Sequence, residues 1–245
     1  MNAGRTLRNP GPGGTPANKG VAVLGCALFV AALFDGGCSR RRAIIAPVPA
    51  ILSEVEGYAS LKLTQYDQTV KSRFSFILEF YRRARIEIRD PLGRSAAVIF
   101  VDDRDGYFVL PSERAYWKAA PAEIIAKFLG TPLSLPEVGG LLCGRWPGIE
   151  QEKAAMTGWS LTRDEVGRWA SGRKESLVFT VREFFPNSPV PRRVEFQTLS
   201  GQGSLSLLAV EFNKPLSDSV FDLSFLNGYA SKDWADIEKA WRHDD

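Results

Sequence analysis

Residues 73–101 read RFSFILEFYRRARIEIRDPLGRSAAVIFV, and the alternation in this stretch decides the fold class. Apolar side chains recur at every second position in its first part, with Ser75 and Glu79 between them. Successive side chains of a β-strand point to opposite faces, so this spacing predicts a strand with one buried face. The residues predicted on that face are Phe74, Phe76, Leu78 and Phe80.

The rest of the stretch predicts further strands joined by tight turns. Ile86 and Ile88 alternate with charged residues, and Ala96–Val101 is almost continuously apolar. The Asp-rich residues Asp102–Gly106 are typical of a hairpin turn, and Tyr107–Leu110 then continues as a strand. An antiparallel meander therefore begins near residue 73 and extends to residue 110.

Two short helices are predicted after the meander. Pro121 suits the first position of a helix, and Ala122–Leu129 carries a single apolar stripe that ends before Gly130. A second helix is expected over Glu137–Cys143, ended by Gly144.

Strand-like patterns resume after these helices. They cover Gly158–Leu161, Leu177–Phe184, Arg192–Leu199 and Ser204–Phe212. Gly201-Gln202-Gly203 is predicted as the tight turn between the last two strands. The tail Ser231–Trp241 is expected to form a helix that turns three side chains to one side, Trp234, Ile237 and Trp241.

The body of the chain is expected to form a single domain, because it contains neither an internal repeat nor a low-complexity linker. The fold class predicted from these elements is mainly β with short helices. The expected boundaries are residues 53–228 for this domain and 229–245 for a C-terminal helix or tail.

The N-terminal residues resemble the signal peptide of a lipoprotein. Residues 1–19 are basic, and residues 20–34 are an apolar run shorter than a membrane span. Small residues then lead into Cys38, which resembles a lipobox and predicts lipidation at that cysteine. We therefore expect a signal peptide over 1–37 and a Pro-containing tether over 38–52.

Two features keep alternatives to lipidation open. Asp35 stands where a lipobox carries a Leu-like residue, and Arg40-Arg41-Arg42 opposes translocation, so an uncleaved N-terminal anchor is the second interpretation. Cys26 matches a lipobox locally but leaves too short an apolar run before it. Ser39 after Cys38 resembles the pattern of lipoproteins that are sorted to the outer membrane.

Composition argues against several classes of function. The net charge is +3, and residues 1–37 alone contribute +2, so the body lacks the concentrated basic charge of a nucleic-acid-binding protein. No two of the three cysteines have a metal-ligand spacing, and the single histidine, His243, lies near the C-terminus. Cys143, on an apolar helix face, is expected to be a buried structural thiol. We expect no enzymatic activity, no cofactor and no metal.

Residues 57–148 resemble the outer-membrane lipoprotein receptor family LolB, part of the LolA/LolB type of lipoprotein-localisation fold. The resemblance rests on motifs in a fixed order rather than on one motif. In sequence order they are Gly57-Tyr58-Ala59, Arg73-Phe74-Ser75-Phe76, Asp90-Pro91-Leu92-Gly93-Arg94-Ser95, Leu129-Gly130-Thr131-Pro132-Leu133-Ser134-Leu135 and Gly144-Arg145-Trp146-Pro147-Gly148.

The resemblance implies an incomplete, strongly curved antiparallel β-barrel closed by helices, with an apolar cavity for the acyl chains of lipoproteins. It further implies that Pro91, Leu92 and Gly93 form a membrane-insertion loop whose leucine acts at the membrane. Type I turn chemistry accounts for Asp90, Pro91 and Gly93 but not for the leucine at the third position. The expected lining of the cavity is Phe74, Phe76, Phe80, Ile86, Ile88, Val98 and Phe100.

The partners implied are lipoprotein cargo and a LolA-like periplasmic carrier. The implied location is the periplasmic face of the outer membrane, through the lipid anchor at Cys38, and we expect a monomer. Two other functions stay open at this level: an assembly lipoprotein that binds a protein partner over a filled core, and a carrier of another amphiphile.

Overall fold

The structure is a computed structural model that describes residues 44–65, 68–80, 82–90, 92–146, 158–199 and 201–243. The predicted signal peptide and Cys38 therefore lie outside the described residues. Residues Ala43–Asp245 form a compact unit, and the buried residues of its core all belong to this unit. We therefore expect Ala43–Asp245 to fold without the preceding residues.

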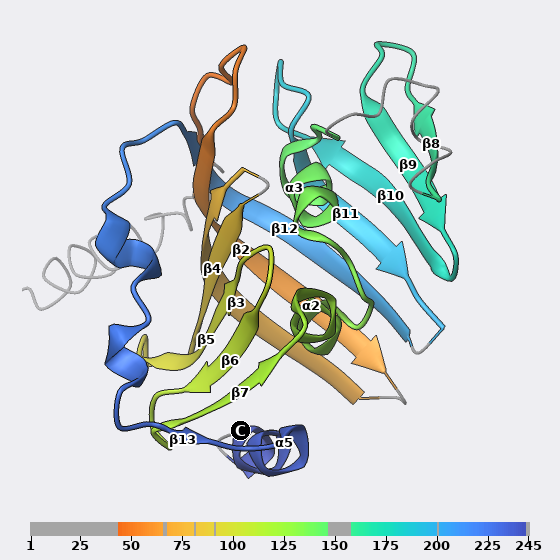
Figure 1. The fold of residues 1–245 in the computed structure, drawn as a ribbon. Coiled ribbons are helices and arrows are strands. Elements are labelled where there is room, and N and C mark those ends of the chain that lie inside the picture. Colours follow the sequence, from red (N-terminus) through yellow and green to blue (C-terminus); the bar gives the residue numbers. More distant parts are fainter. Residues whose placement is uncertain are drawn as a thin grey trace, which may run out of the picture. The chain divides into compact units, whose positions relative to one another are not determined.

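The described residues contain one sheet of thirteen strands (Figure 1). The alternation predicted around residue 76 is observed, with Phe74, Phe76 and Leu78 buried on one face. The strands are β1 Ile44–Ile45, β2 Glu54–Gln65, β3 Gln68–Glu79, β4 Arg83–Arg89, β5 Ser95–Val101, β6 Gly106–Leu110, β7 Ala115–Ala119, β8 Ser160–Arg163, β9 Trp169–Lys174, β10 Leu177–Phe184, β11 Pro191–Gln197, β12 Gly201–Phe212 and β13 Ala230–Ser231.

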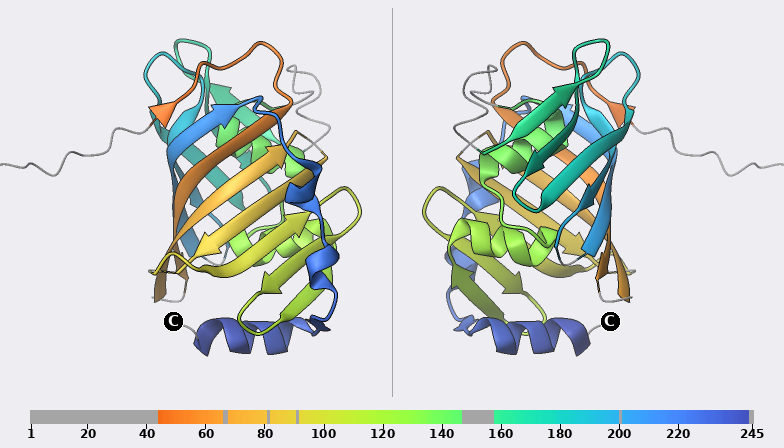
Figure 2. Two further views of the ribbon diagram at one scale, coloured as in Figure 1. Left: turned by 90° about the vertical axis from the view of Figure 1, so that its left-hand side faces the viewer. Right: turned by 90° about the vertical axis from the view of Figure 1, so that its right-hand side faces the viewer.

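The strand order is β13-β7-β6-β5-β4-β3-β2-β12-β11-β10-β9-β8, and β1 pairs with β12 off this path. All neighbours are antiparallel except two short parallel pairs, β1 with β12 and β13 with β7. The sheet curls strongly, but its edge strands β8 and β13 do not pair with each other (Figure 2). The predicted fold class, mainly β with an incomplete curved barrel, is confirmed.

Two helices lie on the concave face of the sheet (Figures 1 and 2), α2 Pro121–Leu129 and α3 Leu135–Cys143. Both predicted helices are therefore present, and α3 begins two residues earlier than expected. Gly130 and Gly144 end them at positive φ, 78° and 66°, where residues with a Cβ are disfavoured.

The C-terminal part of the chain contains two 3₁₀ turns, η2 Asp218–Phe221 and η3 Ser224–Leu226, and then helix α5 Trp234–His243. The predicted tail helix is confirmed. Ile237 is fully buried, and the rings of Trp234 and Trp241 both pack edge-on against Phe108 of β6. The three residues predicted to share one side of this helix therefore all meet the domain.

The antiparallel order divides the turns between two ends of the sheet. Strands β2, β4 and β11 run toward one end, so the β2–β3, β4–β5 and β11–β12 turns lie together there. We call this the tip end. The β3–β4, β5–β6 and β8–β9 turns lie at the opposite end.

Some elements differ from the sequence prediction. Gly201, Gln202 and Gly203 belong to β12, because their backbones pair with residues 63–65 of β2. The turn lies earlier, where the Thr198 amide donates to the Gly201 carbonyl at 2.8 Å. Four strands, β1, β7, β9 and β13, and the two 3₁₀ turns were not predicted, since these segments are very short or lack a clean alternation of polar and apolar residues.

Candidate functional site

An apolar cavity lies between the concave face of the sheet and helices α2 and α3. Its volume is about 40 Å³. Thr131 is the one lining residue with a polar side chain among those described. Both halves of the sheet and both helices contribute to the lining, for example through Phe74, Ile86, Ile99, Phe128, Leu142 and Leu205.

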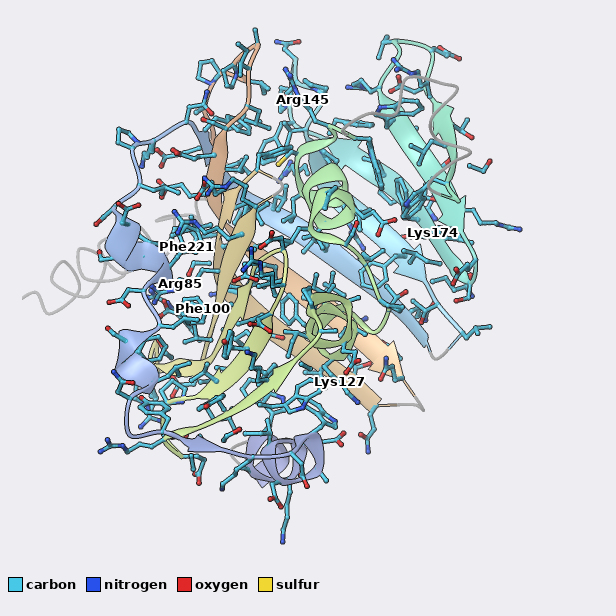
Figure 3. All side chains as sticks on the ribbon, in the orientation of Figure 1. Arg85, Phe100, Lys127, Arg145, Lys174 and Phe221 are labelled. Atoms are coloured by element: carbon cyan, nitrogen blue, oxygen red, sulfur yellow. The ribbon has the colours of Figure 1, made fainter. Side chains whose placement is uncertain are left out.

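Helix α2 covers one side of the cavity almost entirely through apolar contacts. Phe128 packs edge-on against Phe74 of β3, with 5.2 Å between the ring centroids. Ile124 is fully buried, and its side chain occupies the space where Gly106 of β6 lacks a Cβ. At the exposed side of the helix, Lys127 lies over the Trp234 ring at 4.6 Å (Figure 3).

Helix α3 is held on the other side by a buried carboxylate, Glu137. Its Oε2 accepts the Ser134 amide at 2.7 Å, which closes a capping box at the start of the helix. Its Oε1 accepts two further donors from outside the helix, Trp159 Nε1 at 2.6 Å and Lys174 Nζ of β9 at 2.5 Å (Figure 3). Glu137 therefore fastens α3 to the β8–β9 edge.

The ionised form of Glu137 is favoured in spite of its burial. Burial acts to raise the pKa of this carboxyl, but the hydrogen bonds from Lys174, Ser134 and Trp159 lower it further than burial raises it. The resulting pKa lies below the ordinary value of a glutamate. Glu137 was not predicted as a site residue from the sequence, although the Ser134-x-x-Glu137 spacing is a recognisable helix-start signal.

Arg145 attaches the other end of α3 to the N-terminal segment of the domain. Its guanidinium donates to the carbonyls of Pro49 and Ala50, at 2.9 and 2.8 Å (Figure 3). Cys143, in the last turn of α3, is 1% exposed, and burial raises the pKa of its thiol to about 12. The structure therefore places Cys143 in the core, as expected.

Some of the predicted lining residues lie at the cavity and others lie beside it. Phe74 and Ile86 line it directly. Phe76 and Ile88 are buried in the same core without lining the cavity, and Phe80 is half-buried beside Gly139 of α3.

The prediction that Val98 and Phe100 share this face is corrected by the structure. Ile86 of β4 pairs with Ile99, so Ile99 faces the cavity and its neighbours in β5 face outward. Val98 and Phe100 belong to a separate outer cluster. The reason is that both faces of β5 are covered, so its apolar run carries no alternation from which to choose a face.

The outer cluster is covered by the chain around η2 and η3, beginning at Asp218. Arg85 holds this segment by donating to the Val220 carbonyl at 3.1 Å while its guanidinium lies 5.3 Å from the Phe100 ring (Figure 3). Arg83 lies over the Phe221 ring at 4.2 Å. These two arginines therefore have intramolecular partners.

Leu92 projects from the β4–β5 turn at the tip end and is 78% exposed. The turn is fastened around Asp90, whose side chain accepts the Arg94 amide at 2.8 Å and Arg94 Nε at 2.7 Å. Gly93 has φ +82° and donates to the Asp90 carbonyl. Pro91 lies outside the described residues. Desolvation acts to raise the pKa of Asp90, but the hydrogen bonds and the charge of Arg94 together hold it below its ordinary value.

A second turn of the same construction stands at the opposite end of the sheet, between β8 and β9. Asp164 accepts the Arg168 amide and Arg168 Nε, both at 2.8 Å, and Gly167 has φ +84°. Its exposed apolar residue is Val166, 73% exposed. The chain thus contains two similarly fastened turns that display an aliphatic side chain at opposite ends.

No cluster of three or more potential metal ligands occurs among the described residues. Within the same residues, none of the helices has both the length and the apolar character that crossing a bilayer requires.

No protein-family model matches this sequence, and no curated protein matches it. Solved structures with a similar fold include a DUF1329 family protein from Desulfovibrio piger, 11% identical with a TM-score of 0.50, aligned over 72% of this chain and 92% of that one. A LolA superfamily protein from Nitrosomonas europaea is 12% identical with a TM-score of 0.47, over 76% and 96%. A domain from Vibrio parahaemolyticus, described as an outer membrane lipoprotein-sorting protein domain, is 9% identical with a TM-score of 0.48, over 71% and 91%.

The likeness to the Desulfovibrio piger protein establishes a shared fold and nothing about ligands. The observed architecture, an open curved sheet with helices on its concave face, is the architecture that the resemblance to LolB implies. It is common to the LolA/LolB type of fold and does not single out LolB.

Proposed function

We propose that this chain is a lipid-binding protein, anchored through Cys38 at the periplasmic face of the outer membrane, that takes up the acyl chains of lipoproteins and helps insert them there. The observation that carries the proposal is the cavity between the sheet and the helices, whose lining is apolar apart from Thr131. Such a surface suits an alkyl chain, which offers no hydrogen-bonding group.

Uptake requires the cavity to widen. Its 40 Å³ is far below the ~300 Å³ of a typical small-ligand site. Helix α3 is fastened by Glu137 and Arg145, whereas α2 is held chiefly by apolar contacts such as Phe128 on Phe74. When an acyl chain displaces α2, the apolar contacts that the sheet loses with α2 are replaced by apolar contacts with the acyl chain. We therefore assign α2 the role of a lid.

Delivery is assigned to Leu92. An exposed aliphatic side chain on a fastened turn can enter the lipid interface at little conformational cost, because the turn is already ordered. The proposed partners are a LolA-like carrier that brings the cargo and the membrane that receives it. The protein is proposed to act as a monomer without catalysis.

The proposal is tested with the domain Ala43–Asp245, which lacks Cys38 and therefore cannot carry its own lipid anchor. The domain is mixed with a carrier loaded with a fluorescently labelled triacylated lipoprotein. Transfer of the label to the domain, together with retained lipid in native mass spectrometry, is the expected result. If nothing transfers and the domain carries no lipid, the apolar interior is a filled core.

The small volume of the cavity favours a second candidate, an assembly lipoprotein that binds a protein partner through its surface. It predicts no bound lipid and no gain in thermal stability on adding a lipopeptide. A carrier of a different amphiphile is separated from the first proposal by the chemical identity of the retained ligand.

A further inference from the structure

We infer that the outer face of the sheet at its tip end is a docking surface for the head groups of an anionic phospholipid membrane. This inference deepens the proposed function, because it names the surface against which cargo is delivered. It rests on four exposed basic residues from three adjacent strands, which we call the cationic stripe: Lys62, Lys71, Arg73 and Arg89.

The sheet places like charges of the stripe directly opposite one another. Lys62 of β2 pairs in register with Lys71 of β3, and Arg73 of β3 pairs with Arg89 of β4. Lys71 and Arg73 are two residues apart, so the two pairs occupy successive rows of the outer face. Like charges directly opposite each other destabilise a sheet.

Little among the described residues offsets this repulsion. No side-chain hydrogen bond or ion pair joins Lys62, Lys71 or Arg73 to any of them. Arg89 lies 3.5 Å from Glu87, but that carboxylate also accepts the Ser95 hydroxyl and lies 3.6 Å from Arg85. Three cations on one exposed face therefore have no side-chain partner in the part of the chain that the structure describes, which is the arrangement that anionic head groups complement.

A polar groove adjoins the stripe on the same outer face. It has a volume of about 380 Å³ and extends from Lys62 over β12, β11 and β10. Arg182 and Arg193 line it and share one carboxylate, Glu195, at 2.7 and 3.2 Å. With Lys62 the groove presents three cations and one anion, and its size suits a phosphate-bearing head group.

Exposed aliphatic residues at the same end favour a membrane over an acidic protein as the partner. Leu199 in the β11–β12 turn is 92% exposed, Val70 near the end of the β2–β3 hairpin is 51% exposed, and Leu92 stands in the β4–β5 turn. Basic side chains beside shallow apolar anchors are the combination by which proteins bind anionic bilayers.

The test measures partition of the domain Ala43–Asp245 onto cargo-free vesicles of phosphatidylcholine with and without phosphatidylglycerol. We expect binding that depends on phosphatidylglycerol and is lost at high salt, because screening shortens the Debye length to ~3 Å at 1 M. The triple variant Lys62→Gln, Lys71→Gln, Arg73→Gln is expected to partition on the order of 100-fold more weakly, at about fivefold per cation.

The matched control removes the same charge at the opposite end of the sheet, through Arg82→Gln, Arg104→Gln and Arg163→Gln. Arg82 and Arg104 lie in turns at that end, and Arg163 ends β8 beside the β8–β9 turn. The control is expected to bind vesicles as the unaltered domain does. The stripe variant should melt at the same temperature or higher, since its like-charge pairs are gone, so a loss of binding cannot come from unfolding.

The inference is overturned if both triple variants lose vesicle binding equally, or if binding does not depend on phosphatidylglycerol. Failure to bind any vesicle also overturns it, and an acidic protein surface then becomes the partner to test. Because these vesicles contain no cargo, this outcome is independent of lipoprotein transfer, and either proposal can fail while the other stands.

Discussion

At the scale of single residues, two exposed aliphatic side chains and one buried carboxylate distinguish this domain from a plain curved sheet. Leu92 and Val166 stand on turns with the same Asp–Arg fastening, yet only Leu92 lies at the tip end. Glu137 is the buried charge that joins α3 to the β8–β9 edge. Leu92 and Val166 therefore offer a matched pair of substitutions, and the role of Glu137 is tested by the pH dependence of stability.

Leu92→Glu is expected to leave uptake of labelled lipoprotein intact and to reduce delivery into liposomes at least tenfold. A charged side chain does not enter the apolar interface, and the substitution removes no buried contact from the domain. Delivery is measured as label recovered with floated liposomes. Val166→Glu makes the same change on a turn of the same construction at the opposite end, and equal loss in both variants would falsify the assignment of delivery to Leu92.

Glu137→Gln is expected to lower the free energy of unfolding by about 2 kcal/mol at neutral pH, the scale of a charged hydrogen bond. The folded-state pKa of Glu137 is lowered, so its contribution is fully present above the ordinary glutamate pKa and is lost as the pH falls through the lower folded value. Urea unfolding from pH 7 downward measures this. The gap between variant and unaltered domain should narrow below pH ~4.5, and a gap independent of pH contradicts the assignment.

At the scale of elements, the two helices on the concave face are attached by different chemistry. Helix α3 has directional bonds at both ends, through Glu137 and Arg145. Helix α2 begins at a proline and ends at a glycine, and its apolar face packs on the sheet, with the Phe128 ring edge-on against Phe74. Apolar contacts are not directional, so α2 can leave and return without matching a hydrogen-bond pattern.

Phe128→Ala is expected to enlarge the cavity, to lower stability by about 3 kcal/mol and to strengthen binding of a fluorescent acyl probe. Truncating a buried ring loses packing but removes the group that an acyl chain has to displace. Chemical denaturation and probe titration give the two quantities.

Ala84→Val makes the opposite change from the β4 side of the same cavity. It should weaken probe binding at nearly unchanged stability, because two added methyl groups occupy part of the free volume. Probe binding that responds to neither substitution places the ligand elsewhere.

At the scale of the whole molecule, one continuous sheet supplies the floor of the cavity and the outer cationic stripe. Residues of β3 illustrate this, since Phe74 faces the helices while the adjacent Arg73 faces outward. The proposed lipid site and the proposed membrane surface are thus the two faces of the same strands. Because the sheet curves without closing, helices rather than a further pair of strands complete the wall of the cavity. Helix α2 is the part of that wall that we expect to move.

A bound acyl chain should stabilise the whole domain by linkage. At a free ligand concentration of about 100 times Kd, binding contributes about 2.7 kcal/mol, which corresponds to a rise in Tm of roughly 5–10 °C for a domain of this size. Thermal unfolding with increasing triacylated lipopeptide measures the shift. A soluble peptide without acyl chains serves as the control, and an equal rise with that peptide contradicts binding through the apolar cavity.

The sequence by itself determined the elements whose signals are local. Alternation around Phe76 predicted β3, Pro121 and Gly130 bounded α2, and Asp90-Pro91-Leu92-Gly93 indicated the turn that displays an exposed leucine. Each of these signals depends on the conformational preference of a few neighbouring residues, which is the same in any fold.

Only the tertiary structure decided which residues share a face and which charges meet. The inward face of β5 depends on its register with β4, which places Ile99 rather than Val98 at the cavity. Glu137 meets Lys174 across 37 positions of chain, and Lys62 meets Lys71 only through the pairing of two strands. The physical reason is that these contacts arise from sheet register and packing between distant segments, which no local pattern of residues encodes.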